Sequence, residues 1–164
     1  MFYLDLFRAL DTEKVRYLLV GGLALNIHGV ERATMDVDLM LALDAENLRA
    51  FLQAANALAL TPVQPIALAD LTDPAKLQTW AEEKHMFAFA LRAPDPMAPT
   101  LDVLIRPTID FAGAWNRRIE KDLGVARVQL AGIDDLIAMK TGTGRSRDEA
   151  DIEALRRILQ MEQE

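Results

Sequence analysis

The stretch LLVGGLALNIHGVERATMDVDLML, residues 18–41, carries most of the information about fold and function. A short apolar run ends in Gly21 and Gly22, and a pair of carboxylates, Asp36 and Asp38, follows among apolar residues. Alternate side chains of a strand point to the same face, so these two carboxylates are expected to project together, with Cα atoms roughly 6.5 Å apart. Burying two carboxylates together is costly unless a positive charge neutralises them, and a hard divalent cation is the natural partner.

The other phosphate-binding loops known from sequence motifs do not match this chain. There is no GxGxxG fingerprint, and MKTGTGRS at residues 139–146 lacks the upstream glycine and the residue order of a Walker A loop. The interpretation therefore depends on residues 18–41.

The glycine pair followed by Asp-Val-Asp resembles the signature of the polymerase-β-like nucleotidyltransferase superfamily. The resemblance implies that Gly21 and Gly22 let backbone amides approach the triphosphate of an NTP, at the N-terminus of a helix that begins near Leu23. It also implies that Asp36 and Asp38 hold Mg²⁺ or Mn²⁺ against the phosphates during in-line displacement.

A third acid, Asp102, lies within the apolar segment 100–105. From the residues alone it is either a metal ligand or an edge-strand acid that faces water. The superfamily places its third acid on a later strand, so the resemblance implies that Asp102 completes the metal site and helps to deprotonate the attacking hydroxyl.

The pattern GG-x-A followed by HG-x-x-R-x-T-x-D-x-D resembles a narrower branch, the small bacterial and archaeal nucleotidyltransferases that include the abortive-infection toxin group. In this branch Arg32 and Thr34 match motif positions, which implies that Arg32 contacts the triphosphate and that Thr34 orients an acid or caps the strand entry. For His28 we favour a structural role, a helix-end side chain that hydrogen-bonds to the backbone.

The segment IDDLIAMKTGTGRSRDEADIEALRR, residues 133–157, resembles the closing pattern of the same branch. Within it, Lys140 interrupts a helix that otherwise has a buried pattern, and a buried lysine needs a partner. Two partners remain open: an incoming phosphate, which makes Lys140 a nucleotide-binding residue, or Asp148 or Asp151 across the glycine-rich turn.

Composition excludes several kinds of site. The 164 residues include no cysteine and only two histidines, so a metal site must consist mainly of carboxylates. The formal net charge of −7 argues against a grip on extended duplex nucleic acid. With no apolar run long enough to span a membrane and no signal-peptide pattern, we expect a cytoplasmic protein. Most arginines after residue 116 are expected on solvated helix surfaces.

Strands and helices that do not alternate strictly predict an α+β fold with a mixed sheet. We expect a single nucleotidyltransferase-like domain over residues 1–164, with a core of about 1–106 and a helix-rich part of about 107–164. The expected strands are 15–20, 35–41, 62–66, 86–91, 100–105 and 126–130. The expected helices begin near residue 2, cover 23–27, follow Asp44, and include 74–83, 111–121, 133–140 and 147–161.

The leading hypothesis is a metal-dependent nucleotidyltransferase that moves an NMP from an NTP to an acceptor hydroxyl. The acceptor could be RNA such as tRNA, a protein or a small molecule, and the toxin-like branch implies a toxin–antitoxin role with an antitoxin protein as partner. Two alternatives are an inactive module of the same fold that binds a nucleotide or a partner, and an unrelated α+β domain whose GG and DVD are structural.

Overall fold

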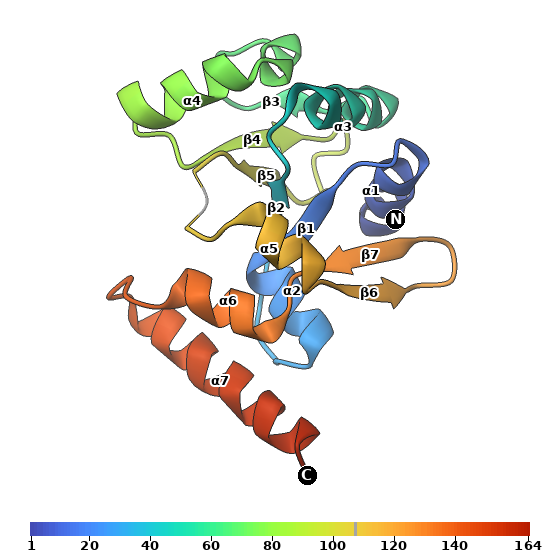
Figure 1. Ribbon diagram of the computed structural model, residues 1–164. Coiled ribbons are helices and arrows are strands. Elements are labelled where there is room, and N and C mark those ends of the chain that lie inside the picture. Colours follow the sequence, from blue (N-terminus) through green and yellow to red (C-terminus); the bar gives the residue numbers. More distant parts are fainter. Residues whose placement is uncertain (107) are drawn as a thin grey trace.

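The computed structural model describes residues 1–106 and 108–164, and a seven-stranded mixed sheet runs through its centre (Figure 1). The strand order is β3-β4-β5-β2-β1-β7-β6, and helices pack around the sheet, which confirms the predicted α+β fold. The strands are β1 Tyr17–Val20, β2 Val37–Leu41, β3 Thr61–Pro62, β4 Ala88–Arg92, β5 Leu101–Leu104, β6 Ile119–Asp122 and β7 Arg127–Leu130.

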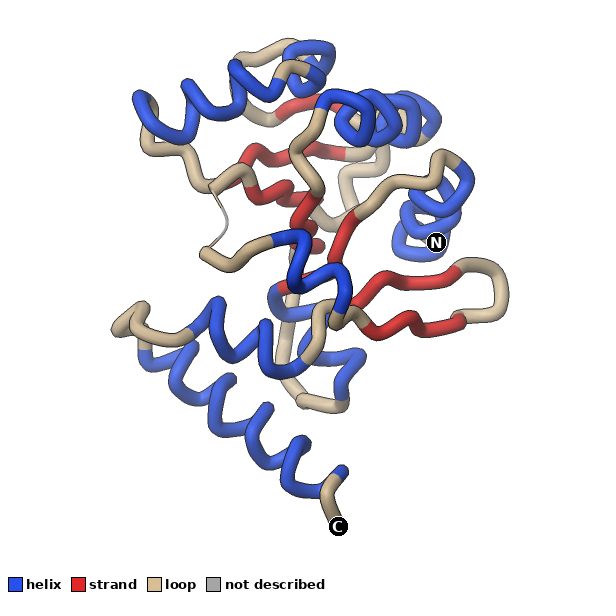
Figure 2. Tube along the Cα trace, in the orientation of Figure 1, coloured by secondary structure: helices blue, strands red, loops and turns tan. Residues whose placement is uncertain are grey.

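Figure 2, with helices in blue and strands in red, shows two helix pairs at opposite ends of the molecule. The helices α3 and α4 lie together at the β3 and β4 end, whereas α6 and α7 lie beside α2 at the other end. Their bounds are α1 Phe2–Thr12, α2 Gly21–His28, α3 Ala45–Ala57, α4 Pro74–Glu83, α5 Phe111–Asn116, α6 Ile133–Lys140 and α7 Ser146–Glu162, with a 3₁₀ helix η1 at Leu68–Thr72.

The register of three neighbouring strands brings the candidate acids together. Strand β2 is antiparallel to β1, where Asp38 stands opposite Val20, and parallel to β5, where Asp38 stands opposite Asp102. Residues directly opposite each other on adjacent strands share one face of a sheet. The prediction that Asp102 lies on a strand near the Asp38 strand is therefore confirmed.

Apolar side chains on β1, β2, β5 and β7 form the centre of the core, and Leu19, Leu39, Val103 and Val128 are completely buried. A strand buried on both faces explains why residues 17–20 read as a continuous apolar run rather than an alternating one. Within residues 1–106 and 108–164, every helix is too short or too polar to span a membrane.

Several helices begin and end close to the residues predicted from local sequence signals such as capping side chains. The Asp44 carboxylate accepts the Asn47 backbone N–H at 2.9 Å and caps α3, and Asp73 caps α4 ahead of Pro74. The helix α6 has the predicted bounds, and α7 begins and ends one residue outside the predicted ones. The helix α2 instead begins at Gly21, directly after β1, and not near Leu23.

The helix expected over residues 111–121 is confirmed at its start, Phe111, but the prediction is wrong after residue 116. The helix α5 ends at Asn116, and residues 119–122 form the edge strand β6. All four β6 residues are exposed, so their pattern resembles a helix surface, but Glu120 pairs with Arg127 and Gln129 of β7. Cross-strand pairing therefore overrides local propensity.

Smaller departures concern strand length and the part of the chain after residue 106. Strand β3 has only two residues, Thr61 and Pro62, so it overlaps the expected 62–66 region at one residue, and β4 begins at Ala88 rather than 86. The part expected to be helix-rich also contributes β6 and β7 to the sheet. The expected boundary between residues 106 and 107 includes Pro107, which lies outside the described residues.

Candidate active site

The turn from β1 into α2 is shaped by its first glycine. Gly21 has a φ of +71°, in the left-handed region that glycine tolerates, and a Cβ there would overlap the Asp38 carboxylate. A Cβ on Gly22 would lie 2.6 Å from the Thr34 hydroxyl oxygen. The Asp38 carboxylate thus lies directly against Gly21, and the loop before β2 packs against Gly22.

Asp38 and Asp102 form the centre of an acidic cluster. Burial, followed by the neighbouring Asp102 and Asp36 carboxylates, raises the pKa of Asp38 to about 6 against the opposing effect of Lys140. Burial and Asp36 also raise the pKa of Asp102, although a hydrogen bond with Asp38 acts in the opposite direction. Asp38 is therefore the group that holds a shared proton in the absence of a cation.

Asp36 lies just outside the strand. Strand β2 begins at Val37, so Asp36 is an exposed residue of the preceding loop, and the expectation that Met35–Leu41 is all strand is wrong at its first two residues. The Thr34 hydroxyl donates a long hydrogen bond of 3.4 Å to the Asp36 carbonyl, so it holds the loop backbone. Asp36 is near enough to raise the pKa of both neighbouring acids.

The acidic cluster fits a hard cation in its chemistry. Carboxylate oxygens are the preferred ligands of Mg²⁺, and like charges that raise each other's pKa are relieved when a cation binds between them. Across residues 1–106 and 108–164, no three acidic, histidine or cysteine side chains are arranged so as to enclose an ion. Asp36 would have to turn toward Asp38 and Asp102 to complete a three-carboxylate site.

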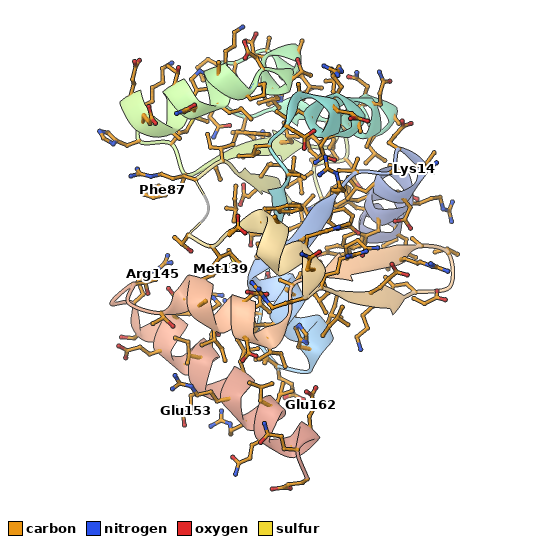
Figure 3. All side chains as sticks on the ribbon, in the orientation of Figure 1. Lys14, Phe87, Met139, Arg145, Glu153 and Glu162 are labelled. Atoms are coloured by element: carbon orange, nitrogen blue, oxygen red, sulfur yellow. The ribbon has the colours of Figure 1, made fainter. Side chains whose placement is uncertain are left out.

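A cavity of about 710 Å³ opens beside this cluster. It extends from Gly21, Gly22 and Asp38 to the α6–α7 turn on one side and to the chain around β4 and β5 on the other. Figure 3 shows Phe87 on the β4 side, across from Met139 and Arg145. Five cations line the cavity, Arg32, Arg106, Lys140, Arg145 and Arg147, against two acids, Asp38 and Asp148.

The cations beside α7 are held by two buried acids. Lys140 pairs with both Asp148 (3.2 Å) and Asp151 (3.0 Å), and Asp151 also pairs with Arg32. Asp148 additionally accepts hydrogen bonds from Thr143 and Arg145. The predicted ion pairs between Lys140 and these acids are confirmed. Because Lys140 also lines the cavity, these pairs are compatible with a contact between Lys140 and a bound phosphate.

Comparison with known proteins identifies the family. The model of the family described as "Nucleotidyltransferase of unknown function (DUF6036)" matches residues 4–163. The chain belongs to this nucleotidyltransferase family. No curated protein sequence matches it significantly.

Solved structures share the fold of this nucleotidyltransferase at low sequence identity. The lincosamide antibiotic adenylyltransferase LnuA, lincomycin-bound, is 16% identical with a TM-score of 0.59, over 96% of this chain and 94% of that one. ANT(2")-Ia in complex with adenylyl-2"-tobramycin is 13% identical with a TM-score of 0.60, over 99% and 90%. An antigenic nucleotidyltransferase-like protein from Paracoccidioides brasiliensis is 18% identical with a TM-score of 0.58, over 98% and 75%.

These matches confirm the superfamily predicted from residues 18–41. They do not test the narrower resemblance to the abortive-infection toxin group, which stays a prediction.

The predicted site residues of this nucleotidyltransferase fall into two sets. Gly21, Gly22, Arg32, Asp38 and Lys140 line the cavity. The other three, Asp36, Thr34 and Asp102, lie behind or beside that wall, next to Asp38 or Gly22. His28 is not among the cavity residues: its Nε2 lies 2.8 Å from the Ala131 carbonyl oxygen, as expected for a helix-end histidine, and burial lowers its pKa.

Sequence reasoning missed several cavity residues. Arg145 and Arg147 are exposed, as expected for solvated arginines, but they also line the cavity, which was not predicted from the sequence. Their position directly after the glycine turn that follows Lys140 was the available signal. Phe87 and Arg106 come from segments just outside β4 and β5, where no motif marks them.

Lys140→Met is expected to lower the free energy of unfolding by about 3 kcal/mol, because it leaves two buried carboxylates without their shared cation. Burial would raise the pKa of Asp148, but Thr143 and Lys140 outweigh it and lower that pKa. The stabilisation is thus present above the usual pKa of an aspartate and is lost as the pH falls through the lowered value. Denaturant unfolding at pH 7 and below pH 4 measures both effects.

Arg157→Met is the matched control, since Arg157 pairs with Glu153 on the exposed face of the same helix. It should change the free energy of unfolding by less than about 0.5 kcal/mol. Equal losses in the two variants would show that the buried ion pairs of Lys140 contribute no more than a surface ion pair.

Proposed function

We propose that this chain transfers an NMP from an NTP to an acceptor hydroxyl and releases pyrophosphate, with Mg²⁺ or Mn²⁺ as cofactor. The observation that supports this best is the cavity itself, which five cations line and into which Asp38 of the half-buried acidic pair opens. Although the net charge of the chain is −7, these five cations line one cavity, which favours a polyanionic ligand. A metal–triphosphate complex matches both the acidic and the basic part.

The proposed roles follow from the positions of the residues. Asp36, Asp38 and Asp102 hold the metal, which would polarise the α-phosphate and stabilise the charge that develops there. Asp102 also accepts the proton of the attacking hydroxyl, whose oxygen forms a bond to the α-phosphorus as the bond to pyrophosphate breaks.

The phosphate-binding residues lie on two sides of the cavity. Gly21 and Gly22 present backbone at the N-terminus of α2, where the helix dipole favours an anion. Arg32 contributes charge directly beside Gly22, Lys140 contributes charge from the end of α6, and Thr34 keeps the loop before β2 against Gly22.

The acceptor is open among three classes. The resemblance to the toxin group favours a cellular RNA such as tRNA, or a protein, with an antitoxin as partner. The structural similarity to LnuA and ANT(2")-Ia, which were solved with lincomycin and with adenylyl-2"-tobramycin, favours a small-molecule acceptor. The alternative function is a catalytically inactive module that binds a nucleotide or a partner, but a half-buried acidic pair that only destabilises the empty protein weighs against it.

The acceptor is identified by incubating the protein with each α-labelled NTP, with Mg²⁺ or Mn²⁺, against total RNA, lysate proteins and a metabolite extract. We expect label in one of the three fractions and none with Asp38→Asn. Nucleotide binding without label in any fraction would support the inactive module instead.

Mg²⁺ or Mn²⁺ is expected to raise the melting temperature, because a ligand that binds only the folded state stabilises it. At a metal concentration of about 100 times Kd the gain is about 2.7 kcal/mol, or roughly 5–10 °C for a chain of this size. Scanning calorimetry with and without metal measures it. The increase should vanish in Asp36→Asn/Asp38→Asn.

The matched control removes two acids from α7, Glu153→Gln/Glu162→Gln, both far from Arg145 along the helix in Figure 3. This control should keep the full increase. If the Asp36→Asn/Asp38→Asn variant kept it as well, the metal would bind elsewhere.

A further inference from the structure

Phe87 is an unusual surface residue. Its side chain is 64% exposed. Among residues 1–106 and 108–164, every other phenylalanine, tyrosine and tryptophan is buried or half-buried. Burying a phenylalanine gains roughly 1.5–3 kcal/mol, so leaving the ring open forgoes that stabilisation. The ring lines the same cavity as Asp38 and Lys140, so a ligand that covers the ring would lie in that cavity.

The backbone of Phe87 is fixed at the cavity rim. Its carbonyl accepts hydrogen bonds from the backbone N–H groups of Ile105 (2.9 Å) and Arg106 (3.3 Å), at the end of β5. The Arg106 guanidinium lies over the ring, 5.4 Å from its centroid. An aromatic ring and a planar guanidinium together make a surface on which another planar ring stacks.

The apolar part of the cavity lies at a defined place relative to the acids. Leu104 also lines the cavity and comes two residues after Asp102 on β5, on the same face of the sheet and roughly 6.5 Å away. Met139 lines the facing wall (Figure 3). The apolar part of the cavity therefore lies at a distance from the acids that is about the length of the sugar of a nucleotide.

We propose that Phe87 is the platform on which the nucleobase of the NTP stacks, between Arg106 and the Met139 wall. This inference rests on the proposed function, because it assumes a triphosphate between Gly21 and Lys140. A nucleoside triphosphate has an apolar planar end and a polyanionic end, and the cavity provides both. Stacking uses the π face that every base has, so Phe87 gives affinity without selecting among the four bases.

Calorimetric titration with Mg²⁺, using the four NTPs and inorganic tripolyphosphate as probes, tests the proposal. Phe87→Ala should bind the tightest NTP roughly 5- to 140-fold more weakly, the factor that corresponds to about 1–3 kcal/mol per stacked base. Its affinity for tripolyphosphate should stay unchanged. Phe87→Trp should keep the NTP affinity, because it keeps an aromatic face.

Met97→Ala is the control, since Met97 is more exposed than Phe87 but does not line the cavity, and its affinities should equal those of the wild type. NTP affinities within twofold of wild type in Phe87→Ala would overturn the proposal, and a raised KM for the acceptor in that variant would then assign the ring to the acceptor.

The phosphate probe separates the two levels of the argument. If the wild type binds tripolyphosphate as tightly as every NTP, the base platform is refuted while the phosphate site stands. If the wild type binds neither, the proposed function itself fails.

Discussion

Asp38→Asn and Asp102→Asn are expected to reduce nucleotidyl transfer by about 10³-fold or more. Each removes a carboxylate from the pair that the β2–β5 register places side by side. A metal held by this pair would supply several kcal/mol of charge stabilisation in the transition state, at about 1.36 kcal/mol for each factor of ten. Initial rates at saturating NTP, compared with those of Glu162→Gln, measure the loss.

The same substitutions should not destabilise the metal-free protein. Burial and the neighbouring acids raise the pKa of Asp38 from 3.8 to about 6, so the folded state binds the proton more tightly than the unfolded state does. This contribution to stability is fully present below pH 3.8 and is lost as the pH rises through 6. Above that pH the charged side chain costs roughly 2–3 kcal/mol, at 1.36 kcal/mol per pKa unit.

Asp38→Asn should therefore be more stable than the wild type at pH 7.5 in EDTA, and the difference should shrink toward pH 4. Denaturant unfolding at several pH values checks this. A clear loss of stability at pH 7.5 in both Asn variants would mean that the carboxylates make structural hydrogen bonds, and would favour the unrelated α+β domain with no catalytic site.

Gly21→Ala is expected to have the second large effect, since it introduces two faults at one position. An alanine in the left-handed region costs roughly 1–2 kcal/mol, and its Cβ would overlap the Asp38 carboxylate, which adds about 1–3 kcal/mol of overpacking. If Asp38 moves aside, the acidic pair is broken and transfer should fall by about 10²-fold or more. Unfolding and initial rates are measured together.

Gly124→Ala isolates the backbone part of this effect. Gly124 has a φ of +86°, and a Cβ there would meet nothing within 4 Å. It should cost only the roughly 1–2 kcal/mol of left-handed alanine and leave transfer unchanged.

In Gly21→Ala/Asp38→Ala the carboxylate is gone and only the 3.0 Å contact with the Cβ of residue 38 remains, so the cost of the alanine at position 21 should fall toward that of Gly124→Ala. If this cost did not change, the collision with Asp38 would not be its cause.

The acidic pair could be predicted from the sequence because its signal is local. Asp38 and Asp102 each interrupt an apolar strand. An acidic side chain is rare in such a strand unless it is paired, so its presence indicates a function, whereas an acid on a polar surface indicates nothing. That the two stand directly opposite each other depends on strand order, which local patterns do not contain.

The other residues that line the cavity could not be predicted in the same way. Arg145 and Arg147 have the composition of a solvated helix start, and only the packing of α6 and α7 turns them toward Gly21. Phe87 and Arg106 meet because β4 and β5 pair in antiparallel register, across 19 residues of sequence. The strand β6 was missed for a related reason, because its exposed residues are defined by β7 rather than by their own pattern.

The most direct test of nucleotidyl transfer compares the position of the label in the NTP. The wild-type protein is incubated with Mn²⁺ and with fresh acceptor, taken from the fraction that the α-labelled NTP screen identifies. Parallel reactions contain the same NTP with the label at either the α- or the γ-phosphate. We expect label on the acceptor only from the α-labelled NTP, release of labelled pyrophosphate from the γ-labelled NTP, and neither with Asp38→Asn. Label on the acceptor from the γ-labelled NTP, or equal transfer by Asp38→Asn, would contradict nucleotidyl transfer at this acidic pair.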